Sequence, residues 1–431
     1  MKRLKSHIHT LLTKGSEKIG TDLVYIVKGG TWLALGQGVA SLGGICLAIA
    51  FANLLSIETY GNLKFILSFL SLLSIPTIQG MNLAIVRTVA QGNEATIYPA
   101  LSLRMKGGFI GSLASLGVAL YFTTTNASSL VFGFLILACA VPFFQTLPLW
   151  KDYLNGKKKF RTLSIYQSTG NILRITVIII TLFITQNIFF ILGAYLLTHI
   201  LTHAATFLIT LKRYPPNTRK DVTTTPYAFH LSAMSVLDTI ANQVDKILLF
   251  FFLGPASIAI YAFALRPVEE LRNLLQSISK LNIPKLSMRD LPTLRHTLSK
   301  KVLLFSLAII PFVALYIILA PLFFSLVFPQ YESAVIYSQV FSLTLILYPK
   351  KIMWHVLTAH AQKKELYVLN TLIPLIKIAL FFTLLPLYSI WGVIATLFII
   401  EVITYVALWI TLFQIGKSDA QHARTPPTAS S

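Results

Sequence analysis

The chain has 431 residues, of which 55% are hydrophobic and only 12% are charged. Soluble globular domains contain about 45–50% apolar and about 25% charged residues, so this composition excludes an ordinary soluble domain. The formal net charge is +21. A basic chain can bind nucleic acid, but these bases lie in short loops between apolar segments. We therefore expect no nucleic-acid partner.

Long apolar segments recur along the whole chain. A helix of about 20 apolar residues crosses a bilayer because its backbone hydrogen bonds are all internal. The sequence therefore predicts an all-α polytopic membrane protein with about 12 transmembrane helices, in two sets of six. Two joints between spans, at residues 186–187 and at 389, must be tight hairpins that hydropathy hardly marks. The number of transmembrane helices therefore stays open between about eleven and fourteen. The predicted spans are Thr31–Leu54, Leu63–Val86, Gly107–Thr123, Ser129–Trp150, Leu163–Thr185, Ile188–Leu211, Tyr227–Gly254, Ile258–Leu281, Val302–Phe328, Ala334–Leu357, Tyr367–Leu387 and Ile390–Phe413.

Lysine and arginine concentrate in alternate loops and at the N-terminus. Bases stay on the cytoplasmic side during insertion, so the pattern predicts that both termini face the cytoplasm. Surface attraction to anionic membrane lipids is a further expected role for them. The loops of the basic set contain, among others, Arg104, Lys157, Arg213, Lys285 and Lys350, and the N-terminus contains Lys2, Arg3 and Lys5.

The longest loop between spans contains Pro215, Pro216 and three threonines from Thr223, a composition typical of a linker. We expect a basic amphipathic N-terminus over residues 1–29, a first lobe over 30–212, a cytoplasmic linker over 213–226, a second lobe over 227–415 and a disordered cytoplasmic tail over 416–431. Cys46 and Cys139 both fall inside apolar spans, so no disulfide and no metal site is expected.

Ionisable residues within spans point to function, because a charge in lipid is costly and faces a wet cavity or a partner. The seventh span carries Asp238, Asn242 and Asp245 on one face, with Gln243 and Lys246 beside them. The eighth span carries a second set, and isolated charges occur in four other spans. These further residues are Arg266, Glu269, Glu270, Arg272, Asn273, Arg87, Arg174, Lys377 and Glu401.

Helical spacing indicates which of these charged residues are expected to pair within their own helix. Glu269 and Glu270 lie three or four residues from Arg266 or Arg272, which favours pairing within the helix, whereas adjacent residues such as Asp245 and Lys246 are expected to pair poorly. His199 and His203 are four residues apart, a spacing that metal ligands also use. With no acidic third ligand nearby in sequence, we interpret them as polar residues facing another helix.

Several short motifs, taken in order, resemble the polysaccharide transporter family of the multidrug/oligosaccharidyl-lipid/polysaccharide (MOP) flippase superfamily. The likeness extends from about Gly29 to Gln414. Pro329 and Ala361 depart from the family pattern, which has glycine near each position. The motifs are Leu54–Gly61, GMNLAIVR at 80–87, IANQVDKILL at 240–249, Tyr261, PKLS at 284–287 and FPQY at 328–331.

The resemblance implies two six-helix bundles in a V shape that open alternately to each side of the membrane. It also implies a flippase rather than an enzyme, acting on a polyprenyl-diphosphate-linked oligosaccharide for cell-surface polysaccharide such as the O-antigen of lipopolysaccharide. The expected location is the cytoplasmic (inner) membrane, and polysaccharide polymerase machinery is an expected partner. No cofactor is expected, apart from a coupling H⁺ or Na⁺.

Residue chemistry assigns roles that agree with this resemblance. A diphosphate in a low-dielectric cavity needs cations, of which arginine gives fork-shaped hydrogen bonds. Amide groups and aromatic faces suit a sugar chain. The candidates for the cationic cavity are Arg87, Lys246, Arg266 and Arg272, those for sugar contacts are Asn242, Gln243, Tyr261 and Asn273, and those for ion coupling are Asp238 and Asp245.

Other functions fit the sequence less well. A cation-coupled exporter of drugs or small molecules predicts a cavity dominated by carboxylates, whereas this chain has as many bases as acids within its spans. A membrane glycan polymerase needs a sizeable outer loop, and every predicted outer loop is short. The chain has no HExxH motif and no Walker loop, so metalloprotease and ATP-driven pump signatures are absent from the sequence.

Overall fold

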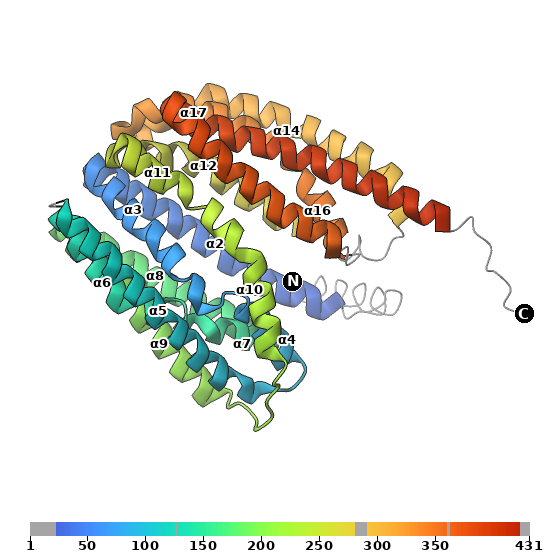
Figure 1. The fold of residues 1–431 in the computed structure, drawn as a ribbon, viewed down its shortest axis with the longest axis horizontal. Helices are drawn as coiled ribbons and strands as arrows, with labels where there is room; N and C mark the ends of the chain where they lie inside the picture. The colour runs from blue at the N-terminus through green and yellow to red at the C-terminus, as the bar shows by residue number, and fades with distance from the viewer. Residues whose placement is uncertain (1–22, 126, 281–290, 360–362, 423–431) are drawn as a thin grey trace, which may run out of the picture. The chain divides into compact units, whose positions relative to one another are not determined.

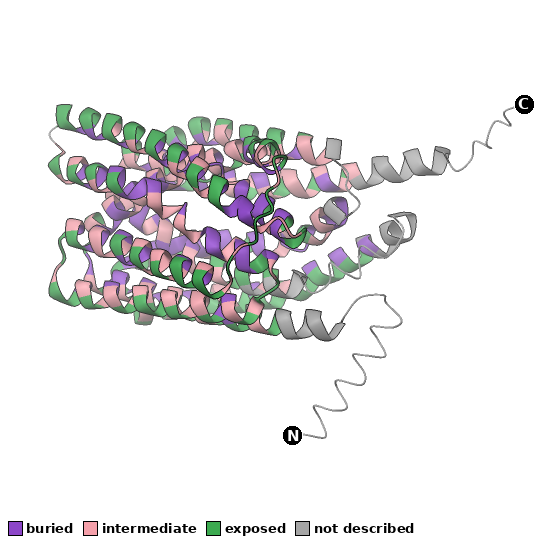
Figure 2. Cartoon of the chain, turned by 90° about the horizontal axis from the view of Figure 1, so that it is seen from below, coloured by how far each residue is buried: buried purple, intermediate pink, exposed green. Residues whose placement is uncertain are grey.

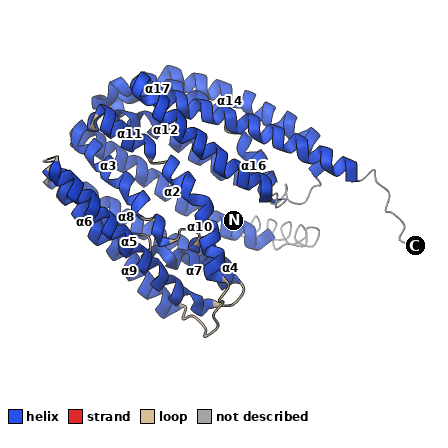
Figure 3. Ribbon diagram, viewed as in Figure 1, coloured by secondary structure: helices blue, strands red, loops and turns tan. Residues whose placement is uncertain are grey.

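The computed structural model describes residues 23–125, 127–280, 291–359 and 363–422 (Figure 1). Within these ranges the regular elements are all helices, and none of the described residues forms a strand (Figure 3). The all-α class expected from the sequence is therefore confirmed. The predicted amphipathic N-terminus lies mostly outside the described residues, as does the PKLS motif at 284–287.

The helices follow the predicted spans closely. Up to the linker they are α2 (Leu23–Leu54), α3 (Ile57–Leu73), α4 (Met81–Ala90), α5 (Ile97–Thr124), α6 (Ser128–Phe144), α7 (Trp150–Gly156), α8 (Phe160–Ile184) and α9 (Ile188–Arg213). After the linker they are α10 (Thr224–Ala241), α11 (Val244–Leu253), α12 (Pro255–Lys280), α14 (Leu291–Val327), α15 (Val335–Ser342), α16 (Lys350–Ala359) and α17 (Lys363–His422). In the described part of the chain, five short 3₁₀ helices join them, namely η1 (Ile75–Thr77), η2 (Glu94–Thr96), η3 (Leu147–Leu149), η4 (Pro329–Ala334) and η5 (Leu343–Leu347).

Seven of the described helical stretches are long and apolar enough to cross a membrane, and a bent pair over Ile57–Leu73 and Ile75–Ala90 makes an eighth. The longest stretch contains two of the predicted spans, because α17 is broken at Ser389, where φ is 54°. The predicted hairpin at 186–187 is also present, since α8 ends at Ile184 and α9 begins at Ile188.

Three predicted spans are broken rather than continuous. The second is bent by 40° between α3 and α4, where Pro76 lies in the first positions of the 3₁₀ turn η1. The seventh is divided into α10 and α11, and the tenth into α15 and α16. Pro349, which has no backbone N–H, precedes α16. Hydropathy does not register such breaks, because the broken segments remain apolar overall.

The described chain divides into two compact units by contact. Unit 1 contains residues up to Ala50 together with Leu73–Ser232, and unit 2 contains Phe51–Leu72 together with Ala233 onward. This grouping assigns α3 to the second unit, whereas the sequence expectation places all of 30–212 in one lobe. The predicted lobe boundaries stay a prediction.

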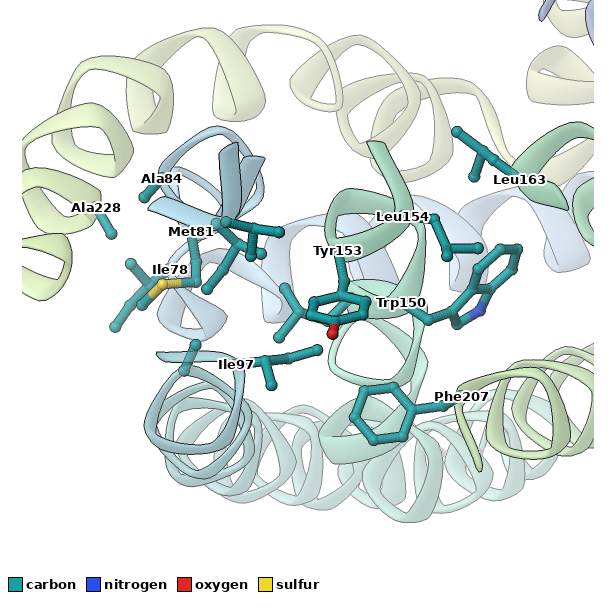
Figure 4. Packing of buried hydrophobic residues seen from close by; sticks show 14 residues of the cluster. Ile78, Met81, Ala84, Ile97, Trp150, Tyr153, Leu154, Leu163, Phe207 and Ala228 are labelled. Atoms are coloured by element: carbon teal, nitrogen blue, oxygen red, sulfur yellow. The ribbon is translucent and has the colours of Figure 1, made fainter. Parts of the chain in front are cut away.

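Each unit has its own buried core. In unit 1, the side chains of Met81, Ile97, Trp150, Tyr153 and Phe207 pack together (Figure 4). In unit 2, α14, α16 and α17 contribute a cluster that includes Val302, Met353 and Leu408. Exposed residues recur along the helices (Figure 2). Large apolar side chains are among them, such as Leu113, which is 70% exposed, and Phe183, which is 73% exposed. An apolar outer surface is what a lipid-facing helix requires.

Small residues allow α5 and α6 to pack closely. A Cβ on Gly108 would lie 2.4 Å from the Cα of Pro142 in α6. The hydroxyls of Ser112 and Ser115 donate to the carbonyls of Ala138 and Phe134, at 2.6 Å and 2.7 Å. Close approach through glycine, with serine hydrogen bonds across helices, is typical of packing within membranes.

The linker is anchored to unit 1 through residues 92–96. The Asn217 side-chain amide donates to the Gly92 carbonyl at 2.6 Å, and the Asp221 amide donates to Thr96 Oγ1 at 2.9 Å. At the other end of the chain, α17 continues to His422, so the tail predicted as disordered from 416 begins as helix.

Candidate functional site: charged clusters within the spans

The break in the seventh span exposes backbone groups that charged side chains satisfy. Asn242 and Gln243 lie between α10 and α11. Gln243 directly precedes the first turn of α11, and its side chain is half-buried. The ammonium of Lys246 donates to the main-chain carbonyl of Asn242 at 2.9 Å. A carbonyl freed from a helix at membrane depth must find such a donor. The break therefore brings a lysine and an unwound backbone together.

Asp245 is the centre of the first cluster, in the first turn of α11. Its side chain is 5% exposed, and Lys246 Nζ lies 3.1 Å from its Oδ1. The hydroxyl of Tyr261 in α12 donates to Oδ2 at 2.5 Å. The expectation that Asp245 and Lys246 pair poorly is wrong. The lysine side chain is long enough to return to its neighbour while it also reaches Asn242, so the angle between their positions does not keep them apart.

Lys377 of α17 joins this cluster. Its Nζ donates to Asn242 Oδ1 at 2.7 Å and lies 5.7 Å from the centre of the Phe381 ring. Asn242 thus accepts from two lysines, through its main chain and its side chain. Sequence reasoning singled out Lys377 without a role; a lone lysine within an apolar span is the signal that identifies it. Asp238 is exposed and makes no ion pair or hydrogen bond through its carboxylate among the described residues.

A second cluster surrounds Glu401 in α17. Arg272 of α12 lies 3.2 Å from Glu401 Oε1, and Lys350 of α16 pairs with Oε2. Arg272 Nη2 also donates to Thr344 Oγ1 at 2.7 Å, and its guanidinium lies 4.9 Å from the Phe341 ring. Lys350 is buried, with its side chain 5% exposed. Two cations therefore share one carboxylate, which leaves the cluster net positive.

Sequence reasoning missed Lys350 as a member of this cluster. By sequence it belongs with Lys351 to the bases of a cytoplasmic loop, because both follow Pro349 at the end of an apolar run. The structure instead begins α16 at Lys350, and the Lys350 ammonium also donates to the main-chain carbonyl of Glu401 at 2.8 Å. No local pattern distinguishes this lysine from its exposed neighbour.

The other candidate residues lie apart from these two clusters. Arg266 pairs with Glu270 at 2.8 Å, four residues on, which confirms the pairing expected within this helix. Glu269 and Asn273 have exposed side chains on α12. Arg87 belongs to unit 1, where its guanidinium lies 4.9 Å from the ring of Tyr227. Of the four cationic candidates, Lys246 and Arg272 thus belong to separate clusters within unit 2, and the roles of all four stay predictions.

Close backbone contact supports the position of Arg87. A Cβ on Gly80 would lie 2.5 Å from the Ala228 carbonyl, and the Gly80 amide donates to Ser232 Oγ at 2.8 Å. Thr88 and Thr224 share a hydrogen bond of 2.6 Å. The GMNLAIVR motif therefore fixes α4 along the first half of α10. Glycine is required at its first position because there is no room for a side chain.

Unit 1 contains a third polar cluster, built on α8 and α9. His203 Nδ1 lies 3.0 Å from the indole nitrogen of Trp150, and His199 contacts Arg174. Both histidines therefore face other helices as polar partners, as the sequence suggested. Within the described ranges, no group of three or more histidine, cysteine or acidic residues is arranged to hold a metal ion.

Comparison with known proteins agrees with this architecture. A family model described as "Polysaccharide biosynthesis protein" matches residues 26–289. No curated protein matches the chain. Among solved structures, the lipid II flippase MurJ in an inward closed conformation has a TM-score of 0.69 at 17% identity, with 88% of this chain and 87% of that one covered.

Two further structures have the same fold. An inward-facing multidrug resistance MATE family transporter of the MOP superfamily has a TM-score of 0.65 at 13% identity, covering 91% of this chain and 96% of that one. A MOP superfamily transporter from Pyrococcus furiosus has a TM-score of 0.61 at 14% identity, covering 93% and 96%. At these identities the likeness is one of fold alone.

Proposed function

This chain belongs to the polysaccharide biosynthesis protein family and has the fold of MOP superfamily transporters. From this we propose that the protein flips a polyprenyl-diphosphate-linked oligosaccharide across the cytoplasmic membrane by alternating access. The observation that carries the proposal is the family match over residues 26–289. In this proposal the glycan serves cell-surface polysaccharide assembly, such as that of an O-antigen. Transport is then followed by polymerisation, so polymerase machinery is the proposed downstream partner.

The charge of unit 2 supports an anionic cargo. Arg272 and Lys350 share Glu401, so one of the two positive charges is not neutralised within the cluster. A diphosphate carries several strong acceptor oxygens and would compete with Glu401 for both cations, as charge-assisted hydrogen bonds are the strongest in a low-dielectric site. Lys246, Arg266 and Arg87 are the other proposed phosphate ligands.

Polar groups of unit 2 support contact with sugars. Asn242, Gln243 and Asn273 provide amide groups that both donate and accept. Tyr261 provides a ring in addition to its hydroxyl. In this proposal these four residues contact the glycan while the polyprenyl tail stays in the bilayer.

Carboxylates of unit 2 are the proposed sites of ion coupling. Asp238 is exposed and Asp245 is buried beside Lys246 and Tyr261. Proton or Na⁺ binding at either carboxylate would change the charge available to the lysines, and with it the affinity for an anionic cargo. Both termini are proposed to face the cytoplasm, on the basis of the loop bases.

Transport by the reconstituted protein tests this proposal. Proteoliposomes are loaded with a polyprenyl-diphosphate-linked oligosaccharide that is fluorescently labelled on its glycan, and a membrane-impermeant quencher reports how much label has changed leaflet. We expect Lys246→Gln and Arg87→Gln to abolish flipping without loss of protein from the membrane. Lys106→Gln, which removes an exposed base of α5, is the matched control. Full flipping by both test variants would remove the cationic-cavity proposal.

Cation-coupled export of drugs or small molecules is the second candidate. It is favoured by the fold shared with a multidrug resistance MATE family transporter. Export predicts that the same proteoliposomes accumulate an organic cation in response to a proton or Na⁺ gradient and leave the lipid-linked glycan unmoved. A membrane glycan polymerase would instead lengthen the glycan, which mass spectrometry of the recovered lipid detects.

A further inference from the structure

A narrow pocket lies within unit 1, between α8, α9 and the start of α7. The residues that line it include Trp150, Gln167, Asn171, Arg174, Thr202 and His203, and no lining residue is acidic. None of these residues belongs to the predicted cargo site. The pocket is therefore a separate polar site with a positive side chain in its wall.

The hydrogen bond between Trp150 and His203 fixes which ring nitrogen of His203 can donate. An indole N–H only donates, so His203 Nδ1, 3.0 Å away, must accept. A neutral ring then carries its hydrogen on Nε2. No hydrogen bond of Nε2 is present among the described residues. His203 therefore offers a donor to a ligand in the pocket that it lines.

Arg174 is oriented by a similar chain of contacts. His199 Nε2 lies 3.1 Å from the Phe144 carbonyl, which only accepts, so His199 Nδ1 accepts from Arg174 Nη1 at 3.2 Å. Arg174 Nη2 donates to Asn171 Oδ1 at 3.3 Å. Two edges of the guanidinium are thus held by neutral partners.

The remaining nitrogen of Arg174 has no partner. Among the described residues, its Nε is buried without a hydrogen bond, and no carboxylate lies within ion-pair distance of the guanidinium. Arg174 is half-buried, but a buried donor atom without a partner is costly, and an anion would satisfy that donor while it neutralises the charge. The distinguishing feature of Arg174 among the described arginines with buried Nε atoms is that it lines this pocket.

We propose that this pocket binds a single phosphate-like oxyanion through Arg174 and His203, with the Asn171 side-chain amide as a further donor. The oxyanion is either free phosphate or the phosphate of a lipid headgroup. His203 lies about three helical turns before the end of α9 at Arg213, so the site lies toward the side predicted to be cytoplasmic. This site is independent of the cargo and of the ion coupling proposed above.

Fluorescence of Trp150 provides a direct readout, because its indole donates to His203. The purified full-length protein in a neutral detergent is titrated with inorganic phosphate at constant ionic strength, with chloride as the balancing anion. We expect a saturable change in emission that Trp150→Phe lacks. Arg174→Gln should weaken the phosphate affinity at least about tenfold, as loss of a charge-assisted hydrogen bond does. Arg161→Gln, the matched control, removes the exposed arginine of the same helix and should leave the affinity unchanged.

A second variant protects the test against misfolding of Arg174→Gln. His203→Asn keeps an acceptor for Trp150 but removes the Nε2 donor, so the fluorescent reporter and its hydrogen bond remain. A weaker phosphate affinity in His203→Asn supports the site. Wild-type affinity in this variant and in any folded Arg174→Gln overturns it.

Nanodiscs distinguish the two sources of the oxyanion. The protein is placed in nanodiscs of phosphatidylcholine with or without phosphatidic acid, and the phosphate titration is repeated in each. If phosphatidic acid shifts Trp150 emission and blocks the response to free phosphate, the ligand is a lipid headgroup. If only free phosphate acts, the ligand is the soluble anion. Absence of any response to either one overturns the proposal.

Discussion

The Tyr261 hydroxyl donates to Asp245 Oδ2 at 2.5 Å, and both side chains are buried in unit 2. The bond connects α12 to the first turn of α11, directly after the break in the seventh predicted span. Lys246 completes the arrangement at 3.1 Å from the other carboxylate oxygen. The two residues that the sequence assigned to sugar contact and ion coupling are therefore direct partners.

Removal of this hydroxyl should destabilise unit 2 and alter the charge state of the cluster. We expect Tyr261→Phe to lower the free energy of unfolding by about 1–3 kcal/mol, because Asp245 loses a buried donor. Flipping should fall as well. Tyr60→Phe is the matched control, since Tyr60 is buried in the same unit and its hydroxyl makes no hydrogen bond among the described residues. Thermal unfolding in detergent checks the stability, and equal melting temperatures for the two variants would contradict the expectation.

Neutralisation of Glu401 should leave two cations in close proximity without a counter-charge. Arg272 and Lys350 both pair with this carboxylate, so Glu401→Gln should cost about 3–5 kcal/mol of stability, as loss of one member of a buried ion pair does. Adding Lys350→Met should restore part of the loss. The double-mutant cycle measures this coupling. Additive effects of the two substitutions would show that the Lys350–Glu401 pair contributes nothing to stability. Glu269→Gln, which changes an exposed side chain of α12, is the control.

The close packing of α5 and α6 predicts a strong dependence on side-chain size at Gly108. A Cβ there would lie 2.4 Å from the Pro142 backbone, so Gly108→Ala should destabilise the protein by about 1–3 kcal/mol through overpacking. Gly117 lies on the same helix, and a Cβ added to it would have no atom within 4 Å. Gly117→Ala should therefore be neutral or stabilising. Equal thermal stabilities would mean that the two helices are not in contact at this position.

The linker carboxylate Asp221 predicts a dependence of local stability on pH. Its hydrogen bonds from the Thr223 hydroxyl and amide lower the pKa of Asp221 below the usual aspartate value. A carboxyl group with a lowered folded-state pKa contributes stability above its unfolded pKa and loses it as the pH falls through the folded value. Amide hydrogen exchange at the start of α10 should therefore be faster in Asp221→Asn at neutral pH. The difference from wild type should disappear in acid, and a constant difference would contradict this.

The sequence predicted the helices well because hydropathy reports directly on burial in lipid. Each of the twelve apolar segments corresponds to helix in the described residues, although three of them are broken, and the hairpins near Asn187 and Ser389 are where the sequence indicates them. The pairing of Arg266 with Glu270 followed from helical spacing alone. These features depend only on residues close together in the chain.

Features that depend on distant residues were not predicted. Lys350 reaches Glu401 from another helix, and Lys377 reaches Asn242 across a separation of 135 residues. Spacing in a single sequence contains no information on such contacts, so the charged residues were identified but their partners were not.

The composition of lipid-linked glycans in cells that lack the gene tests the central claim most directly. The lipid-linked oligosaccharides are extracted, their leaflet is assigned with an impermeant glycan-modifying reagent, and the surface polysaccharide is measured in the same cells. The account predicts that intact lipid-linked repeat units accumulate on the cytoplasmic leaflet while surface polymer is lost. Normal surface polysaccharide, together with raised sensitivity to cationic drugs, would contradict it and favour an exporter.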